Sequence, residues 1–271
     1  MKHVAVFCSI ILIGIILISA FAPLIAPYDP NAVDMTQRLE PPSREHPLGT
    51  DGVGRDLLSR TIYGGRASIV LALAATFCSM MVGLIIGLVA GYFGGVADWF
   101  VTTLSSVFQG IPDLCFMVAL AGILEPGTHS ILISVTITSW VGFSRIVRSE
   151  VMRLKGESYI ESARGIGASH LRILFSDILP NIMGDILVLF TNRLGSVILS
   201  TAALSFLNLG IQPPTPDWGV MINDARSTFR SAPRLAIAPG FCIFALSFSV
   251  NFIGDFLRDS LDVRKNNASQ S

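Results

Sequence analysis

Residues 159–181, YIESARGIGASHLRILFSDILPN, form a polar and charged stretch between two apolar runs. Within it, Glu161 and Arg164 are three residues apart, so a helix would place both on one face. Ala163 and Gly167 are small enough to let another backbone approach closely. These residue types favour a surface that binds another protein. The alternative is an ordinary solvated loop between helices.

Catalytic and metal-binding patterns are not evident elsewhere in the sequence. An intramembrane enzyme would need a paired Ser/Lys, a paired Asp/Asp or an HExxH motif, and we see none of them. No G-x-x-x-x-G-K-[ST] sequence occurs, so this chain cannot bind ATP with a P-loop. The cysteines lie singly in apolar runs, where they pack as small apolar residues, and the histidines form no ligand pair. These residues are Cys8, Cys78, Cys115 and Cys242, and His3, His46, His129 and His170. The sequence predicts neither an enzyme nor a metal or cofactor site.

The composition places the chain in a bilayer. Of its 271 residues, 51% are hydrophobic and only 14% are charged, with a mean hydropathy of +0.63. A soluble domain carries about 25% charged residues. The 19 Lys and Arg balance the 19 Asp and Glu, so no overall charge indicates nucleic acid as a partner.

Six apolar runs are long enough to cross a membrane. They are residues 4–22, 67–90, 100–124, 131–146, 182–209 and 235–256. The first resembles a signal peptide, but Pro23 is a poor cleavage context and the apolar core is too long, so we expect a retained span. The predicted fold is all-α, a polytopic membrane protein with six transmembrane helices.

The spans divide the chain into three parts. Residues 1–22 hold the N-terminus and first span, residues 23–66 form a polar outer connection, and residues 67–271 form a core of five spans with a cytosolic tail. The connection is rich in proline, which favours an extended chain. Its last part, residues 55–64, suits a short amphipathic helix at the membrane surface.

Glycine and proline predict details of the packing. Gly83, Gly87 and Gly91 recur every four residues and place bare backbone on one helix face, which favours tight packing within the subunit. Pro112 removes a helical hydrogen bond, so we expect a kink at residues 110–112, where a break can line a pathway. Residues 212–218, rich in proline, either cap the outer mouth or fix the angle between two spans.

The positive-inside rule gives the orientation. Basic residues cluster at the end of the fourth span and in the loop to the fifth span, which predicts that this loop lies in the cytosol. They are Arg145, Arg148, Arg153, Lys155, Arg164 and Arg172. Six spans would then put both termini in the cytosol as well.

Several separated stretches resemble the C-type permease subunit of dipeptide, oligopeptide and nickel ABC importers. They are PLGTDGVGRDLLSR from Pro47, AGYFGG from Ala90, LSFLNLGIQPPTPDWG from Leu204 and NFIGDFLRDSLD from Asn251. The fifth is the EAA loop at residues 157–181, which follows E-A-A-x3-G-x9-I-x-L-P with Ser162 at the second position and Asp177 at the isoleucine position.

The resemblance implies a type I importer permease that works by alternating access. The EAA loop would insert into a cytosolic ABC ATPase, which binds the ATP, so this chain needs no cofactor of its own. The residues implied in this coupling are Glu161, Ser162, Ala163, Arg164, Gly167, Leu179 and Pro180. The other implied partners are a B-type permease, an extracytoplasmic solute-binding protein and the lipid of a bacterial inner membrane.

The fifth span departs from the family pattern. Thr201 stands where related permeases often carry an acidic residue, and Arg193 falls well inside the span. An arginine at mid-bilayer costs about 2.5–3.5 kcal/mol on insertion scales, so it should face a polar cavity or a partner. We hypothesise that Arg193 and Asn192 line the passage and meet a carboxylate-bearing cargo, with Thr201 a further candidate. The alternatives are that Arg193 snorkels or pairs with Asp185.

The resemblance favours small peptides as the cargo. The segment WGVMINDAR from Trp218 is similar to nickel-type permeases, so nickel or a metal–chelator complex is the alternative cargo for the same mechanism. A proton- or sodium-coupled transporter would want inverted repeats and matching broken helices, and we see neither.

Overall fold

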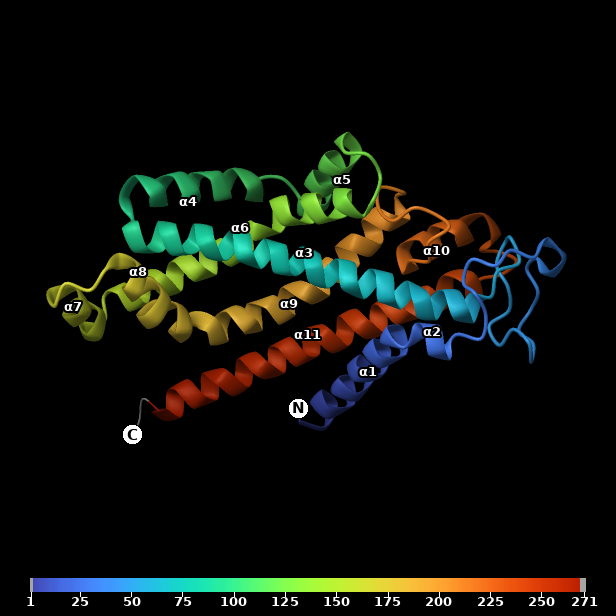
Figure 1. Cartoon of the computed structure of the whole chain (residues 1–271), viewed down its shortest axis with the longest axis horizontal. Coiled ribbons are helices and arrows are strands. Elements are labelled where there is room, and N and C mark those ends of the chain that lie inside the picture. Colours follow the sequence, from blue (N-terminus) through green and yellow to red (C-terminus); the bar gives the residue numbers. More distant parts are fainter. Residues whose placement is uncertain (1, 269–271) are drawn as a thin grey trace.

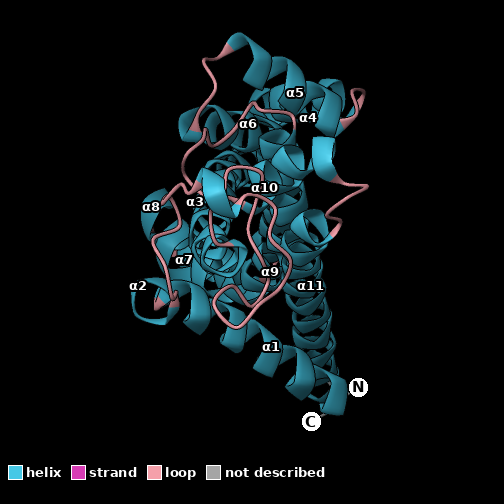
Figure 2. Ribbon diagram, turned by 90° about the vertical axis from the view of Figure 1, so that its right-hand side faces the viewer, coloured by secondary structure: helices cyan, strands magenta, loops and turns pink. Residues whose placement is uncertain are grey.

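A computed structural model describes the backbone of residues 2–268 and the side chains of residues 3–260. Over this range the chain forms helices and loops with no strand, as Figure 2 shows. The α-helices are α1 (Lys2–Ala20), α2 (Ala22–Ile25), α3 (Leu57–Phe93), α4 (Gly95–Gln109), α5 (Asp113–Ile123), α6 (Thr128–Lys155), α7 (Ser158–Gly165), α8 (His170–Arg172), α9 (Leu179–Phe206), α10 (Trp218–Asp224) and α11 (Arg234–Ala268). Two 3₁₀ turns, η1 (Met35–Gln37) and η3 (Ala225–Thr228), and one π-helical segment, η2 (Ile173–Ile178), complete the order.

The long helices lie roughly side by side and give the molecule two distinct ends (Figure 1). One end carries α7 and α8 and is called the α7 end. The opposite end carries α10 and the loops before α3 and is called the α10 end. The start of α1 and the last part of α11 both point away from the α10 end.

Among the described residues, five helices are long and apolar enough to cross a membrane, or six spans if a bent pair is counted as one. The five are His3–Ala20, Leu57–Phe93, Thr128–Lys155, His170–Phe206 and Arg234–Ser260. The bent pair is α4 and α5, which meet at an angle of 91°. The break predicted at residues 110–112 is therefore confirmed, but it is a sharp corner between two helices rather than a kink in one span. The predicted polar tail continues α11 as helix to Ala268, and residues 269–271 lie outside the described range.

The first half of α3 differs from the prediction. Asp56 caps this helix, because its carboxylate accepts hydrogen bonds from the backbone N–H of Ser59 at 2.7 Å and from the Ser59 hydroxyl at 2.7 Å. From Leu57 the helix runs unbroken to Phe93. The expectation of a separate surface helix at residues 55–64 is wrong, because nothing in this stretch ends the helix that Asp56 starts.

The glycine face of α3 packs directly on α6. A Cβ atom at Gly83 would lie 2.6 Å from the Trp140 carbonyl oxygen, and one at Gly91 would lie 2.8 Å from the Arg148 carbonyl oxygen. At Gly87 the same atom would lie 2.7 Å from the carbonyl oxygen of Ser144. Only glycine permits such an approach, so the predicted packing within the subunit is confirmed.

A compact cap precedes α3 at the α10 end. His46 and Asp56 are both buried, and His46 Nδ1 lies 2.8 Å from Asp56 Oδ1. The other ring nitrogen of His46 lies 3.1 Å from Gln37 Oε1, and the Tyr28 ring lies 4.7 Å from the His46 ring. This network ties residues 28–46 to the cap of α3 and explains why a polar, proline-rich connection holds one conformation.

The side chain of Trp218 packs α10 against α3. Its side chain is 2% exposed, and its indole N–H donates to the Thr61 carbonyl at 2.8 Å. The ring fits because Gly64 and Gly65 leave room for it: a Cβ at Gly65 would lie 2.7 Å from the Trp218 ring. Asp217 caps α10 and accepts a hydrogen bond from the Ser68 hydroxyl at 2.7 Å, while burial raises the pKa of its carboxyl group. These contacts favour the interpretation in which residues 212–218 fix the arrangement of the spans.

Two apolar clusters lie inside the bundle. The larger joins α3, α5, α6, α9, α10 and α11 and includes Trp218 and Leu246. The smaller lies at the α7 end, where Tyr92, Val151, Ile160 and other residues from α3, α6, α7, η2 and α9 meet. The second cluster anchors the polar stretch with which the sequence analysis began.

Replacing Gly87 by alanine tests the contact of α3 with α6. The added methyl group would meet the backbone of α6, so we expect the variant to be destabilised by about 1–3 kcal/mol, measured by unfolding in detergent. Gly122→Ala is the matched control, because a Cβ there meets nothing within 4 Å. Equal stability of the two variants would contradict a tight contact.

Candidate functional site

The candidate site is the coupling segment, residues 157–181, at the α7 end. It consists of α7, a turn at Gly167, the single-turn helix α8 and the π-helical segment η2 that leads into α9. Gly167 has φ +81°, a left-handed conformation that favours glycine, and a Cβ there would meet nothing within 4 Å. Within this chain, Gly167 therefore serves the turn rather than a close contact.

The segment is held by one buried apolar row. Ile160 of α7 and Ile173 and Ile178 of η2 are each 0% exposed. They pack in the second cluster with α6 and α9, and Ala163 lies partly buried against it. Burying side chains of this size contributes about 1.5–3 kcal/mol each. The segment is therefore a folded unit of the protein and not a solvated loop.

Tyr92, at the end of α3, joins the coupling segment to two spans. Its hydroxyl lies 2.9 Å from His170 Nδ1 at the start of α8, and its backbone carbonyl accepts a hydrogen bond from Lys155 Nζ at 2.6 Å. The Arg164 guanidinium of α7 lies 5.4 Å from the centre of the Tyr92 ring, within the range of a cation–π contact. One buried side chain thus contacts α6, α7 and α8. We call these four residues the Tyr92 hub.

The outward face of the segment is free to bind another protein. Glu161, Ser162, Arg164 and Gly167 are exposed. Two large apolar side chains beside them are also exposed, Ile166 at 81% and Leu171 at 67%. Exposed apolar side chains beside charged ones are typical of protein-binding surfaces.

Leu179 and Pro180 begin α9, as the sequence predicted, with the proline in the first turn of the helix. They do not end the coupling segment with a break, because α8, η2 and α9 form one helical run from His170 to Phe206. A movement of the coupling segment would therefore pass straight into α9.

A second polar feature lies between α4 and α6. It is a groove of about 610 Å³, called here the α4–α6 groove, and it is lined by Thr102, Ser105, Ser106, Gln109, Gly110, Arg145, Arg148 and Ser149. Arg148 is paired with Asp98, its Nη2 lying 2.7 Å from Asp98 Oδ2, and Arg145 donates to Gln109 Oε1. The groove reaches Gly110 at the corner between α4 and α5, so the predicted helix break lines a polar cavity.

The three candidate pathway residues occupy other places on α9. Arg193 lies with its guanidinium against Gly142 of α6, where a Cβ would come within 2.6 Å of Arg193 Cζ. Thr201 is 3% exposed and donates to the Ile198 carbonyl at 3.0 Å. None of the three lines the α4–α6 groove. Their role in a passage stays a prediction.

Asn192 takes part in a reciprocal contact between α9 and α11. A Cβ at Gly254 would lie 3.0 Å from Asn192 Cγ, and one at Gly195 would lie 2.5 Å from Asn251 Cγ. Each helix thus has an asparagine followed three residues later by a glycine. Each asparagine side chain lies against the glycine of the other helix. The two N-x-x-G sequences carry this signal, although we did not predict the pairing from them.

The sequence analysis named Arg164 as a coupling residue but did not predict that Tyr92 and His170 belong to the site. Tyr92 lies inside the AGYFGG stretch, but nothing in the sequence shows that α6, α7 and α8 meet there. His170 was considered only as a possible metal ligand. Among the described residues, no group of three or more His, Cys, Asp or Glu could hold a metal ion.

Solved structures share this fold. A methionine ABC transporter, MetNI, in an inward-facing conformation matches with a TM-score of 0.59 and 17% identity, over 75% of this chain and 95% of that one. An amino acid ABC transporter with histidines matches with a TM-score of 0.56 and 17% identity, over 74% of this chain and 94% of that one. These matches show that the chain has the fold of the membrane permeases of ABC importers.

The family follows from the sequence comparisons. Residues 83–266 match the model of the binding-protein-dependent transport system inner membrane component, and residues 1–42 match the N-terminal transmembrane domain of oligopeptide transport permease C. The chain therefore belongs to the binding-protein-dependent transport system inner membrane component family. It is a multi-pass permease, and importers of this family work with an ATPase, a second permease and a binding protein.

Two relatives are similar over nearly their whole length. The glutathione transport system permease protein GsiD of Pectobacterium atrosepticum is 40% identical over 262 residues, covering 96% of this chain and 87% of that protein. The protein of the same name from Escherichia coli O6:K15:H31 is 40% identical over 96% of this chain and 86% of that protein.

A double-mutant cycle tests the Tyr92 hub. Tyr92→Phe removes only the hydroxyl that contacts His170, and we expect it to lower the free energy of unfolding by about 0.5–1.5 kcal/mol. His170→Ala should cost a similar amount, and the double variant should cost less than the sum of the two. Tyr63→Phe is the control, since the Tyr63 hydroxyl has no hydrogen bond within the described residues. Additive effects of the two hub variants would contradict the contact.

Proposed function

We propose that this permease imports small peptides, including glutathione-like peptides, across a bacterial inner membrane by alternating access. The assignment of the cargo rests on the 40% identity of this chain, over 96% of its length, to permeases named for glutathione transport. The peptide named there carries free carboxylates, which agrees with the sequence-based hypothesis of a carboxylate-bearing cargo. The alternative cargo, nickel or a metal–chelator complex, has no comparable support.

We infer that the chain couples a partner to the membrane and performs no chemistry itself. ATP would bind to cytosolic ABC ATPase subunits, which would grip the exposed face of the coupling segment at Glu161, Ile166 and Leu171. In this proposal the chain is not an enzyme and needs no cofactor. The absence of a P-loop from the sequence supports this division of labour.

The geometry suggests how movement would spread from the coupling segment. The Tyr92 hub ties α7 and α8 to the ends of α3 and α6, and the glycine contacts hold α3 and α6 together as one body. The run from α8 through η2 into α9 supplies a second connection. A shift of the ATPase would therefore move three spans together.

The α4–α6 groove is our candidate for part of the passage. Arg145 is exposed in the single chain, and a charged side chain inside a membrane faces a water-filled cavity or a partner. A second, B-type permease would complete this wall. The basic residues around the coupling segment favour its placement in the cytosol, with both termini on the same side.

Reversing one charge on the coupling segment tests the docking to the ATPase. Glu161 is exposed and its side chain has no hydrogen bond or ion pair within the described residues, so Glu161→Arg should leave the fold intact. We expect the purified complex to lose most of its ATPase subunit. Glu45→Arg makes the same charge change in an exposed residue at the opposite end and should retain the ATPase. Full retention in both variants would count against docking at this surface.

Uptake measurements test the cargo. Cells lacking this chain should lose uptake of labelled glutathione or labelled dipeptide, and restoring the chain should recover it. If only the uptake of chelated nickel were lost, the cargo would be the metal–chelator complex instead of a peptide.

The same assay examines Arg193. Restoring the chain as Arg193→Ala should reduce peptide uptake if this side chain meets the cargo. Unchanged kinetics in an assembled complex would remove Arg193 from the passage.

A further inference from the structure

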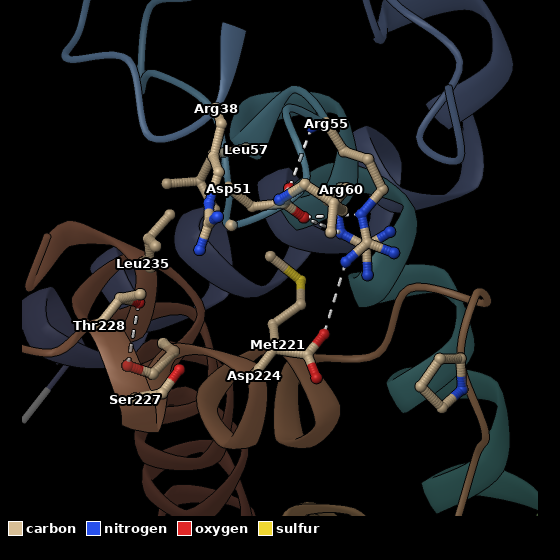
Figure 3. Close-up of a pocket in the computed structure, with 14 residues that line it drawn as sticks. Arg38, Asp51, Arg55, Leu57, Arg60, Met221, Asp224, Ser227, Thr228 and Leu235 are labelled. Carbon is tan, nitrogen blue, oxygen red and sulfur yellow. Dashed lines mark hydrogen bonds and ion pairs between the residues drawn. The ribbon is translucent and has the colours of Figure 1, made fainter. Parts of the chain in front are cut away.

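A charged pocket lies at the α10 end, opposite the coupling segment (Figure 3). It has a volume of about 350 Å³ and lies between residues 51–60, α10, η3 and the start of α11. Arg38, Arg55 and Arg60 contribute its positive charge, and Asp51 and Asp224 its negative charge. Figure 3 shows Asp224 facing the arginines from the α10 side. The site belongs to neither the coupling segment nor the α4–α6 groove.

The two carboxylates leave part of the positive charge unmatched. Asp51 Oδ2 lies 2.7 Å from Arg55 Nε and 3.5 Å from Arg60 Nε, so one carboxylate is shared by two guanidinium groups. Asp224 Oδ2 lies 3.5 Å from Arg55 Nη2. Arg38 is exposed and makes no ion pair or hydrogen bond within the described residues. Three arginines and two aspartates thus line the pocket, and the pocket keeps an excess positive charge.

Arg60 supplies an unused donor. Its side chain is 1% exposed, and its Nη1 donates to the carbonyl oxygens of Pro30 at 2.9 Å and Pro214 at 3.3 Å. Its Nη2 is buried and has no hydrogen-bond partner among the described residues. A buried charged donor without an acceptor is costly, and a bound anion would satisfy it. Water would accept the hydrogen bond but would leave the excess charge in place.

We propose that this pocket binds the carboxylate of a small organic ligand, such as the free C-terminus of a short peptide. A guanidinium fork matches a carboxylate geometrically, and an excess of one positive charge suits a single carboxylate group. Leu57, Met221 and Leu235 form an apolar part of the wall, and a pocket of this volume suits a small molecule rather than a protein segment. The inference rests on the proposed peptide cargo and adds to it a contact outside the α4–α6 groove.

The environment of Asp224 agrees with this assignment. Burial raises the pKa of its carboxyl group, while Arg55 and Arg60 act in the opposite direction. An incoming carboxylate would compete with Asp224 for the same arginines.

Calorimetric titration of the whole purified transport complex tests the proposal, with glycylglycine and glycylglycinamide as probes. We expect glycylglycine to bind about tenfold more tightly than the amide, which lacks the carboxylate, and Arg38→Gln to weaken glycylglycine by about tenfold. Arg38→Gln should fold normally because the side chain is exposed and unpaired. Arg60→Gln should also weaken binding, but it removes a buried side chain, so the conclusion depends on Arg38.

Arg66→Gln is the matched control, since Arg66 is an exposed arginine on α3 that does not line the pocket. Equal binding of the two probes, no binding of either, or carboxylate-dependent binding unchanged in Arg38→Gln would each overturn the proposal. A complex that binds glycylglycine as expected but imports no peptide would instead overturn the proposed cargo. A complex that imports peptides but treats both probes alike would overturn only the pocket.

Discussion

The contact of α3 with α6 is the constraint on which the rest of the structure depends. In lipid, apolar side chains gain little by meeting each other, so two helices associate when their backbones can approach closely. Gly83, Gly87 and Gly91 allow this approach over the C-terminal part of α3. The ends of the two helices are therefore held at fixed positions, and the Tyr92 hub forms where they finish. The smaller apolar cluster then seats the coupling segment against that end.

Several charged groups of this protein lie beside a partner side chain or at the two ends of the bundle. At the α7 end, Arg164 and Lys155 lie over the Tyr92 ring. The other charged residues of the coupling segment are exposed, except Asp177, which is half-buried. Between α4 and α6, Arg148 has Asp98 as its partner. At the α10 end, His46 and Asp56 pair inside the cap, and arginines share carboxylates around a pocket. The exposed surface of α11 carries apolar side chains such as Phe241 and Phe244.

Asparagine and glycine make a second close contact, between α9 and α11. The side chain of Asn192 lies against Gly254, and that of Asn251 lies against Gly195. Each asparagine therefore faces a residue that has no side chain. Small residues at helix interfaces and polar side chains that bridge helices are both characteristic of membrane bundles. This contact connects α9, which continues from the coupling segment, to the last span.

Much of this protein was determined by the sequence alone. The apolar runs predicted the spans, because no loop can cross hydrocarbon with its backbone unsatisfied. The spacing of three glycines predicted close packing, and the resemblance of Glu161, Ala163, Gly167 and Pro180 to the EAA loop predicted a coupling segment, whose docking role stays a prediction. These features are local, so they are visible in one stretch of chain. The prediction from sequence was wrong where two neighbouring patterns form one element. Residues 55–64 were expected to be a separate surface helix, but most of them belong to the long helix that Asp56 caps. Only the tertiary structure decided that Tyr92 meets His170, that α4 and α5 turn a sharp corner beside a polar groove, and that Arg38, Arg55 and Arg60 converge on one pocket. Tyr92 and His170 are 78 residues apart, and the pocket also needs Asp224 of α10, so packing rather than spacing brings these residues together.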